Sequence, residues 1–587
     1  MKSFRIINRI KQDKDHISII LQCVFSIFLF LFCIRHISET SNLIVWDELG
    51  YWGSAAYYAG YDWSSIVTAN SGYYSYGYSL ILALLLYIFA PLKFAYQAAI
   101  IVNALLSVGS YILANYVGCF FVKKEKKLYV VIAAFAVSMY GNNITQTCFA
   151  WPEVLLIFLF WTLVALFVSL YQRYRLQKVL LICVVLVYMF FVHSRTIGVV
   201  IAGFLSIIVF VSRKFNKKDL WKISFIAALI VTLFGLGQFI REDVKNEVWR
   251  VLADTPLANT SSVLITDTVN KFTVKGVWEI IKTFFNRIYY WGCVSYFFVF
   301  ACIKELCIRL YLNIKNKEWN PIFLFLILSM LGNFGVLSLT LSFQGTYQAL
   351  LYGRYADNII GPFLLLGLLF FFTKENTSTK KNVVWELFVY EIIMMILYIN
   401  VRSIEINRDY FVANCNVDFY KYWIGTEKGG YNFPEFMLIA ILVYSCMLIV
   451  RWMLNHDKKI LAWIAIVILL SVYSKNKYDV SESVFYKTYT NCDGMTKIID
   501  DIARYCDNYE LVYFYHDSNW RCTPLEMWIQ FRMYDKKVVD VSSLEKLSDC
   551  MVLIPRELVQ EGTYLPSTEV FGELILEDKY ISLYKFP

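Results

Sequence analysis

The chain has 587 residues, of which 58% are hydrophobic and only 17% are charged, and its formal net charge is +9. Soluble domains contain about 25% charged residues, and a mean hydropathy of +0.52 leaves too little polar surface to cover so much apolar sequence. With 26 Gly, 10 Pro and 18% aromatic residues, disordered, collagen-like and coiled-coil chains are excluded as well. The composition therefore predicts a polytopic membrane protein.

The basic residues do not form one patch, so the positive charge does not indicate a nucleic-acid-binding protein. Most of them stand in clusters between apolar runs, as in 123–127 and 213–218. Because cytoplasmic loops are enriched in Lys and Arg, we place these clusters in the cytoplasm, which requires an even number of crossings between successive clusters. The N-terminus is then expected in the cytoplasm and the C-terminus outside the cell membrane.

A helix needs about 20 mostly apolar residues to cross a bilayer. The apolar segment 78–90 cannot be a full crossing, since it would place the cluster 123–127 outside, and we expect it in the outer interface or re-entering. Extracytoplasmic loops are expected at 38–91, 142–151, 241–287, 342–358 and 401–433. The pattern predicts about thirteen spans, at 17–37, 92–122, 128–141, 152–171, 179–193, 196–212, 220–240, 288–303, 320–343, 357–373, 383–400, 434–453 and 460–474.

The composition changes after the last span, which divides the chain into a membrane domain, 1–474, and a tail, 475–587. The tail contains no Gly-rich nucleotide-binding motif. Four cysteines there permit two disulfides, and unpaired thiols fit equally well: Cys492, Cys506, Cys522 and Cys550. The tail's periodicity predicts a small extracytoplasmic α/β domain, with helices at 495–505 and 525–534 and strands at 511–515, 537–541, 551–555 and 580–586.

Two adjacent carboxylates, Asp47 and Glu48, open an uncharged aromatic segment in the first expected loop. If the segment is a helix, both acids lie at its N-terminus, where the helix dipole favours the ionised form. An ionised carboxylate beside an aromatic wall can act as a general base toward a hydroxyl, but Asp is also a favoured capping residue. One face of the helix would carry Asp47, Tyr51, Ser54 and Tyr58.

A further acid, Glu153, stands at the outer start of an expected span, directly after Pro152. An acid in that position is costly if it faces lipid, so we expect it to face a polar cavity. The alternative is structural, because Pro and an acid both suit the first turn of a helix. Both readings are compatible with the sequence.

Three cations stand apart from the cytoplasmic clusters, at outer span ends: Arg195, Arg354 and, as a weaker case, Arg287. Such side chains often only extend to lipid headgroups. The alternative is an anion clamp, because a guanidinium offers a planar fork that matches phosphate. Acids, cations and aromatics on one membrane face suit an enzyme with a membrane-embedded, phosphate-linked donor. Rival hypotheses are a cell-envelope polysaccharide polymerase or flippase and a non-catalytic envelope scaffold.

These motifs, in their order and placement, resemble the GT-C glycosyltransferases, such as the aminoarabinose–lipid A transferases and the protein O-mannosyltransferases. The resemblance covers roughly residues 17–373. It rests on the first-loop Asp-Glu-x-x-Tyr, the interfacial segment 78–90, the acid that opens the fourth crossing and the later Gly-Arg-Tyr, carried here by Asp47, Glu48, Tyr51, Glu153, Arg195, Gly353, Arg354, Tyr355 and Pro362. The segment 73–78 departs from the pattern, because it lacks the cation and the prolines that many members have there.

The resemblance implies a polyprenyl-phosphate sugar donor, an acceptor that is lipid-linked, cell-wall or lipid, and inversion at the sugar. It implies that Asp47 is the catalytic base, that Glu153 positions donor or acceptor, and that Arg354 holds the phosphate. Supporting roles fall to Glu48 in catalysis and to Arg195, Tyr355, Tyr51 and Arg287 in substrate binding. We expect no cofactor and no metal.

Overall fold

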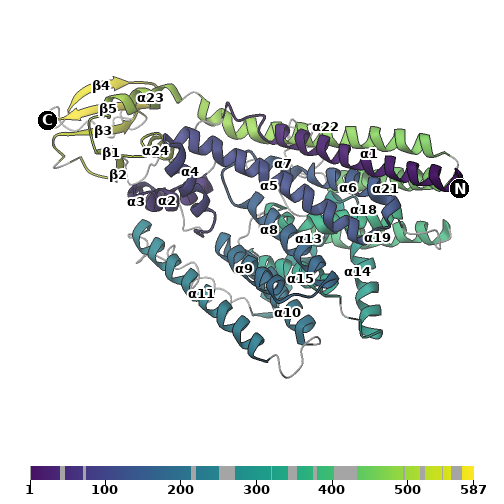
Figure 1. Cartoon of the computed structure of the whole chain (residues 1–587). Coiled ribbons are helices and arrows are strands. Elements are labelled where there is room, and N and C mark those ends of the chain that lie inside the picture. Colours follow the sequence, from purple (N-terminus) through teal and green to yellow (C-terminus); the bar gives the residue numbers. More distant parts are fainter. Residues whose placement is uncertain are drawn as a thin grey trace.

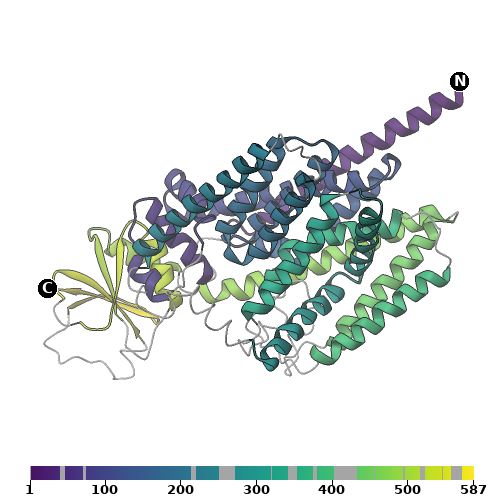
Figure 2. The same cartoon turned by 90° about the horizontal axis from the view of Figure 1, so that it is seen from below.

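The computed structural model describes residues 2–39, 46–70, 75–212, 220–249, 272–318, 320–341, 353–373, 380–401, 433–456, 458–493, 496–515, 523–544, 547–556 and 572–587. A large helical part carries a small sheet at one end, and the start of α1 lies at the other end (Figure 1). The same separation of the two termini is visible from below (Figure 2). The sheet therefore caps one end of the helical part.

The helices before residue 250 carry the two acids of the first loop and cover the first seven expected spans. Their bounds are α1 Lys2–Cys33, α2 Trp46–Tyr58, α3 Ser64–Asn70, α4 Ser79–Phe89, α5 Leu92–Phe121, α6 Lys127–Ser138, α7 Gly141–Gln146, α8 Glu153–Gln172, α9 Leu176–Val192, α10 Ile197–Ser212 and α11 Leu220–Val248. Short 3-10 turns precede α6 and α10, at η1 Lys124–Lys126 and η2 Ser194–Thr196. The segment expected in the interface is α4, whose 11 residues are too few to cross a bilayer.

The later helices complete the membrane part and lead into the sheet. Their bounds are α13 Val274–Val294, α14 Phe298–Lys315, α15 Pro321–Leu341, α17 Gly353–Ala356, η5 Asp357–Ile359, α18 Ile360–Thr373, α19 Lys380–Val401, α21 Phe433–Leu454 and α22 Lys459–Asp493, followed by α23 Thr496–Tyr505 and α24 Thr523–Arg532. The expected domain boundary at 475 lies inside α22. The change in composition therefore occurs within one continuous helix.

Nine helices of the described part are long and apolar enough to cross a membrane, so the chain is a multi-pass, mainly helical membrane protein. The total of about thirteen crossings and the orientation of the termini stay predictions. Two expected spans coincide with shorter helices, because α6 has 12 residues and α9 has 17.

The expected span 288–303 is wrong as a single helix. The α13 helix ends at Val294 and α14 begins at Phe298. Between them Tyr296 and Phe297 have φ values of 51° and 65°, a left-handed backbone that cannot continue a right-handed helix. No Gly or Pro occupies these two positions, so the sequence carries no signal for the break. The expected loop 241–287 is also partly helical, since α11 continues to Val248 and α13 starts at Val274.

The C-terminal sheet has five strands in the order β2-β1-β3-β5-β4. The β1 strand pairs in parallel with β2 and β3, whereas β5 is antiparallel to β3 and β4. Both predicted helices and all four predicted strands are present within two residues of the expected bounds, and β4 was not predicted. The strands are β1 Leu511–Tyr515, β2 Lys537–Val541, β3 Cys550–Pro555, β4 Glu573–Glu577 and β5 Ile581–Phe586.

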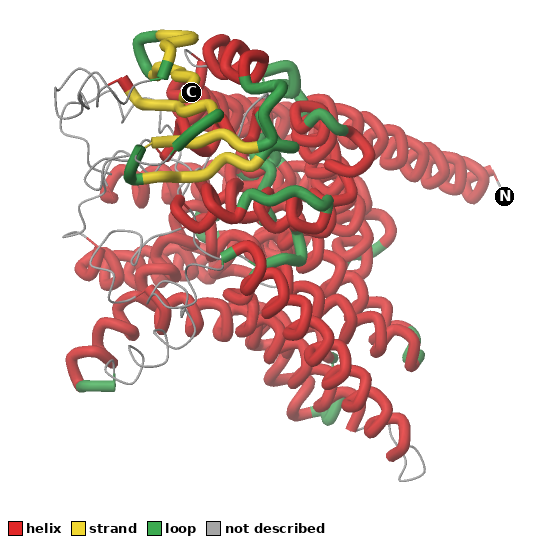
Figure 3. The backbone as a smooth tube through the Cα atoms, turned by 90° about the vertical axis from the view of Figure 1, so that its left-hand side faces the viewer, coloured by secondary structure: helices red, strands yellow, loops and turns green. Residues whose placement is uncertain are grey.

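Cys506 and Cys550 are free thiols in this domain, so the two-disulfide alternative does not hold. The side chains of Cys492 and Cys522 lie outside the described part. Viewed from the sheet end, the strands stand in front of the helical part (Figure 3). The sheet packs there through α24 and β2 against α2 and α3 of the first loop, and the candidate site lies at this end.

Candidate active site

The predicted acid-bearing helix of the first loop is present as α2, and both acids lie in its first turn. The second acid, Glu153, begins α8 directly after Pro152, as expected. Arg195 lies in the 3-10 turn η2 between α9 and α10. Arg354 lies in the one-turn helix α17, just before α18. Four separate chain segments therefore present their charged side chains at helix ends.

The structure brings these four charges into one continuous chain of ion pairs. Arg354 lies between the two acids, with Nη1 2.7 Å from Asp47 Oδ2 and Nε 2.7 Å from Glu153 Oε1. Arg195 Nη2 lies 3.0 Å from the same Glu153 oxygen. The Glu153 side chain is fully buried, while 30% of the Asp47 side chain is exposed. Buried charges are tolerated only when they are paired, and here two carboxylates are matched by two guanidinium groups.

Aromatic side chains surround the two guanidinium groups. The central carbon of Arg354 lies 3.6 Å from the ring centroid of Trp151, and that of Arg195 lies 4.2 Å from the ring of Tyr355. Burial raises the pKa of Tyr51 well above its ordinary value, and the nearby Glu153 carboxylate raises it further. Tyr51 is thus a neutral phenol beside the charged cluster. Of these aromatic residues, Tyr51 and Tyr355 were expected at the site from the sequence, and Trp151 was not.

Glu48 has a different environment from its neighbour Asp47. It is fully buried, and its Oε1 accepts a hydrogen bond of 2.7 Å from the Tyr96 hydroxyl. The same oxygen accepts a hydrogen bond from the backbone N–H of Ala150. Glu48 therefore joins α2 to α5 and to the turn before α8, whereas Asp47 is the acid that a substrate can reach.

The structure does not bring Arg287 into the cluster through any contact in the described part of the chain. Arg287 is buried on α13. Its guanidinium donates to the backbone carbonyl of Thr283 at 2.9 Å and to that of Leu337 at 3.5 Å. These contacts support a helix–helix role between α13 and α15.

Asp357 is a buried acid that the sequence interpretation did not assign. It lies three positions after Arg354, and it accepts hydrogen bonds from Tyr290 at 2.8 Å and from Tyr140 at 3.2 Å. With its amide oriented to accept, Asn358 takes a hydrogen bond of 2.9 Å from Arg195 Nη2. The segment 353–358 is thus held from several sides. The only sequence signal was the proximity of Asp357 to Arg354.

Three buried polar atoms of the cluster have no hydrogen-bond partner in the described structure: Glu153 Oε2, Arg195 Nε and Trp151 Nε1. Buried polar groups are normally satisfied, so such a convergence indicates a place for a polar ligand. Among the described residues, no group of three His, Cys, Asp or Glu side chains could hold a metal ion.

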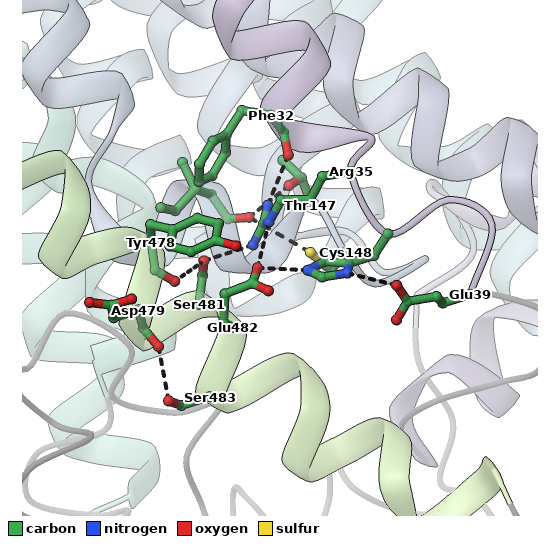
Figure 4. Close-up of polar contacts among 12 residues, drawn as sticks. Phe32, Arg35, Glu39, Thr147, Cys148, Tyr478, Asp479, Ser481, Glu482 and Ser483 are labelled. Atoms are coloured by element: carbon green, nitrogen blue, oxygen red, sulfur yellow. Dashed lines mark hydrogen bonds and ion pairs between the residues drawn. The ribbon is translucent and has the colours of Figure 1, made fainter.

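A second polar cluster lies between α22 and the segment that precedes α8 (Figure 4). Arg35 Nε and a ring nitrogen of His36 each lie 2.7 Å from Glu482 Oε1. Thr147 and Cys148 lie beside this cluster in the view, only a few residues before Ala150 and Trp151. The turn that carries part of the candidate site is thus held between α5 and α22.

An apolar cavity opens within the membrane part of the structure. It lies between α6, α18, α21 and α22, near the break between α13 and α14. Its lining includes Leu364, Leu368 and Trp463, and its polar residues include Tyr473 and Asn476. Its lining on α18 begins at Leu364, ten positions after Arg354, and none of its lining residues belongs to the charged cluster.

No family model and no curated protein match this sequence. The structure is similar to crystal structures of ArnT from Cupriavidus metallidurans bound to undecaprenyl phosphate, with a TM-score of 0.51 and 11% identity, and in the apo state, with 0.51 and 10%. Each match covers 96% of this chain and 97% of that chain. The archaeal oligosaccharyltransferase AglB from Archaeoglobus fulgidus is less similar, with a TM-score of 0.43 and 11% identity over 93% of this chain and 70% of that chain. The chain thus has the GT-C fold that the sequence resemblance implied.

Proposed function

We propose that this protein is a membrane glycosyltransferase that moves a sugar from a polyprenyl-phosphate donor to an acceptor hydroxyl on the extracytoplasmic face. The observation that carries the proposal is the chain Asp47–Arg354–Glu153–Arg195, which joins a partly exposed acid to two cations at one end of the membrane part. A polymerase or flippase has no need of an acid at this position. A non-catalytic scaffold would have no reason to bury Glu153 and Arg354 together, since such pairs add little stability.

Arg354 is the proposed ligand of the donor phosphate. A guanidinium presents five N–H groups in a planar fork, and its contacts with Asp47 and Glu153 fix the orientation of that fork. The ArnT structure bound to undecaprenyl phosphate shows that a protein with this fold accommodates a polyprenyl phosphate.

Asp47 is the proposed general base. It would accept the proton of the acceptor hydroxyl while the hydroxyl oxygen forms a bond to the anomeric carbon from the face opposite the phosphate. The bond between the anomeric carbon and the phosphate oxygen breaks, and its electron pair leaves with the polyprenyl phosphate. This single displacement inverts the anomeric centre. Arg354 and Arg195 would stabilise the negative charge that develops on the leaving phosphate.

The sugar would lie among Glu153, Trp151 and Tyr355. Glu153 Oε2 and Trp151 Nε1 are buried without a partner among the described residues and could bind sugar hydroxyl groups. The rings of Trp151 and Tyr355 both lie against the Arg354 guanidinium, and Tyr51 adds a neutral phenol that can donate a hydrogen bond. Glu48 supports this arrangement through Ala150 rather than by touching substrate.

The decisive experiment is a transfer assay with the purified protein in lipid vesicles. A panel of polyprenyl-phosphate monosaccharides is offered with envelope glycolipids as acceptors, and release of polyprenyl phosphate is measured. The proposal expects release with at least one donor and none with the Asp47→Asn variant. Mass analysis of envelope glycans from cells with and without the protein identifies the product. Identical envelope glycans together with no release from any donor would contradict the proposal.

A further inference from the structure

The C-terminal sheet domain packs directly on the helix that carries Asp47. The helix α24 of the sheet domain contacts α2, α3 and α5. At the centre of this contact lies Phe531, which is buried. Its ring centroid lies 5.8 Å from those of Trp52 and Tyr96, with interplanar angles of 84° and 87°, and 6.4 Å from that of Trp63. Such edge-to-face pairs are favourable and depend on geometry.

One of these partners leads directly to the acids of the first loop. The Tyr96 ring touches Phe531 on one side, and its hydroxyl donates to Glu48 Oε1 at 2.7 Å. The same Glu48 oxygen accepts from the N–H of Ala150, next to Trp151. Glu48 adjoins Asp47 in the first turn of α2. The Phe531 side chain is therefore connected, through the ring and the hydroxyl of Tyr96, to the first turn of α2 and to the turn before α8.

Three polar contacts hold the two parts in register around this aromatic centre. The indole N–H of Trp63 donates to the carbonyl of Tyr534 at 2.8 Å. Lys537 Nζ lies 2.6 Å from Asp62 Oδ2. The backbone N–H of Asp540 donates to Ser65 Oγ at 3.0 Å. These contacts join the start of α3 and the two residues before it to β2 and to the turn after α24, so the sheet domain contacts the first loop through two of its own segments.

The Asp62 contact persists at physiological pH. Burial alone would raise the pKa of Asp62, but hydrogen bonds from Lys537 and Ser64 lower it, with a net value of about 2. The carboxylate is therefore ionised throughout the neutral range, and its pair with Lys537 is lost only when the pH falls through about 2.

We propose that the C-terminal sheet domain is a positioning element for the catalytic acid, and that Phe531 is the residue through which it acts. The inference rests on the proposed function of Asp47, because it assigns the sheet domain a role in the same site. Phe531 touches neither substrate nor the reacting atoms. Its ring packs against Tyr96, and the Tyr96 hydroxyl donates to Glu48. Glu48 in turn connects the first turn of α2 to the turn before α8.

The test compares Phe531→Ala with a matched variant, Phe586→Ala. Phe586 is a buried phenylalanine of the same domain, but it packs in a separate cluster with Tyr515 and Val552, away from the first loop. Small misplacements of a catalytic group cost about 10²-fold in rate, so Phe531→Ala should lower kcat by about that factor. The donor KM should change less than kcat, because Arg354 is also held by Glu153 on α8. Phe531→Leu should restore part of the lost kcat.

Hydrogen exchange supplies a readout that does not depend on activity. Phe531→Ala should speed amide exchange in α2 and in residues 147–151, whereas Phe586→Ala should leave both segments unchanged. If the wild-type protein transfers no sugar, the proposed function fails, and the exchange measurement still decides the coupling. Equal loss of kcat in the two alanine variants would show that the loss reflects the stability of the sheet domain and not the positioning of Asp47, and it would overturn the inference. Unchanged exchange in α2 of Phe531→Ala would overturn it as well.

Discussion

Arg354 and Asp47 are 307 residues apart in the chain, yet Nη1 of the arginine lies 2.7 Å from Oδ2 of the aspartate. The proposed phosphate ligand and the proposed base are therefore direct neighbours. In the proposed reaction the Arg354 guanidinium stands between the donor phosphate and the Asp47 carboxylate, so that the leaving group and the base lie on different sides of it. This proximity places the leaving group and the base in one compact site, and it makes each residue sensitive to changes in the other.

Replacing Asp47 with Asn should abolish transfer while expression and folding stay normal. The amide keeps the size of the side chain and can still accept a hydrogen bond from Arg354, but it cannot take a proton from the acceptor. Loss of a general base removes about 10²–10⁴-fold in rate. Turnover of the purified variant in vesicles measures the effect. Normal turnover would exclude Asp47 as the base.

Glu48→Gln should differ from Asp47→Asn by lowering stability as well as rate. Glu48 is fully buried and accepts from Tyr96 and from the Ala150 N–H. Hydrogen bonds to a charged group contribute about 1.5–3 kcal/mol each, and the neutral amide weakens both. The thermal unfolding midpoints of Glu48→Gln and Asp47→Asn, both measured in detergent, test this difference. A Glu48→Gln protein as stable as wild type would contradict the bracing role.

Arg354→Ala should raise the apparent donor KM strongly, and Arg354→Lys should rescue it only in part. A charged hydrogen bond to phosphate contributes about 1.5–3 kcal/mol, and Lys replaces the charge but not the planar fork that also contacts Glu153. Donor affinity of the three proteins is the measurement. If the side chain were only a membrane anchor, all three affinities would be equal.

Gly353→Ala should weaken donor binding through the segment that carries Arg354. A Cβ atom at this position would lie 2.1 Å from the hydroxyl oxygen of Tyr290, the same hydroxyl that donates to Asp357. The ring and Asp357 must shift, and Arg354 shifts with them. Gly335→Ala is the matched control, because nothing lies within 4 Å of a Cβ there. Equal donor affinity in both variants would show that this contact is not needed.

The C-terminal domain should lie on the extracytoplasmic face. A cysteine added after Pro587 is expected to react with a membrane-impermeant thiol reagent in intact cells, with the unmodified chain as the background. Lys124→Cys, in a cluster expected in the cytoplasm, should react only after the cells are opened. The opposite result, a C-terminal thiol that stays protected in intact cells, would place the sheet domain and the candidate site on the cytoplasmic side.

The sequence by itself determined the local features of this protein. Long apolar runs identified the membrane helices, because burial of a helix in lipid depends on the hydrophobicity of that segment alone. Alternating and helical periodicity located both tail helices and four of the five strands. The missed strand, β4, is mostly exposed and therefore lacks the apolar alternation that marks a half-buried strand.

Only the tertiary structure decided how the polar residues are used. Glu48 and Asp47 are adjacent and of the same type, yet one is buried beneath Tyr96 and the other faces the site, since neighbouring positions on a helix point in different directions. Arg195 and Arg287 both stand at helix ends in the sequence, but only Arg195 reaches Glu153. The left-handed break at Tyr296 and the contact of Phe531 with Tyr96 likewise depend on packing between distant segments, which no local pattern records.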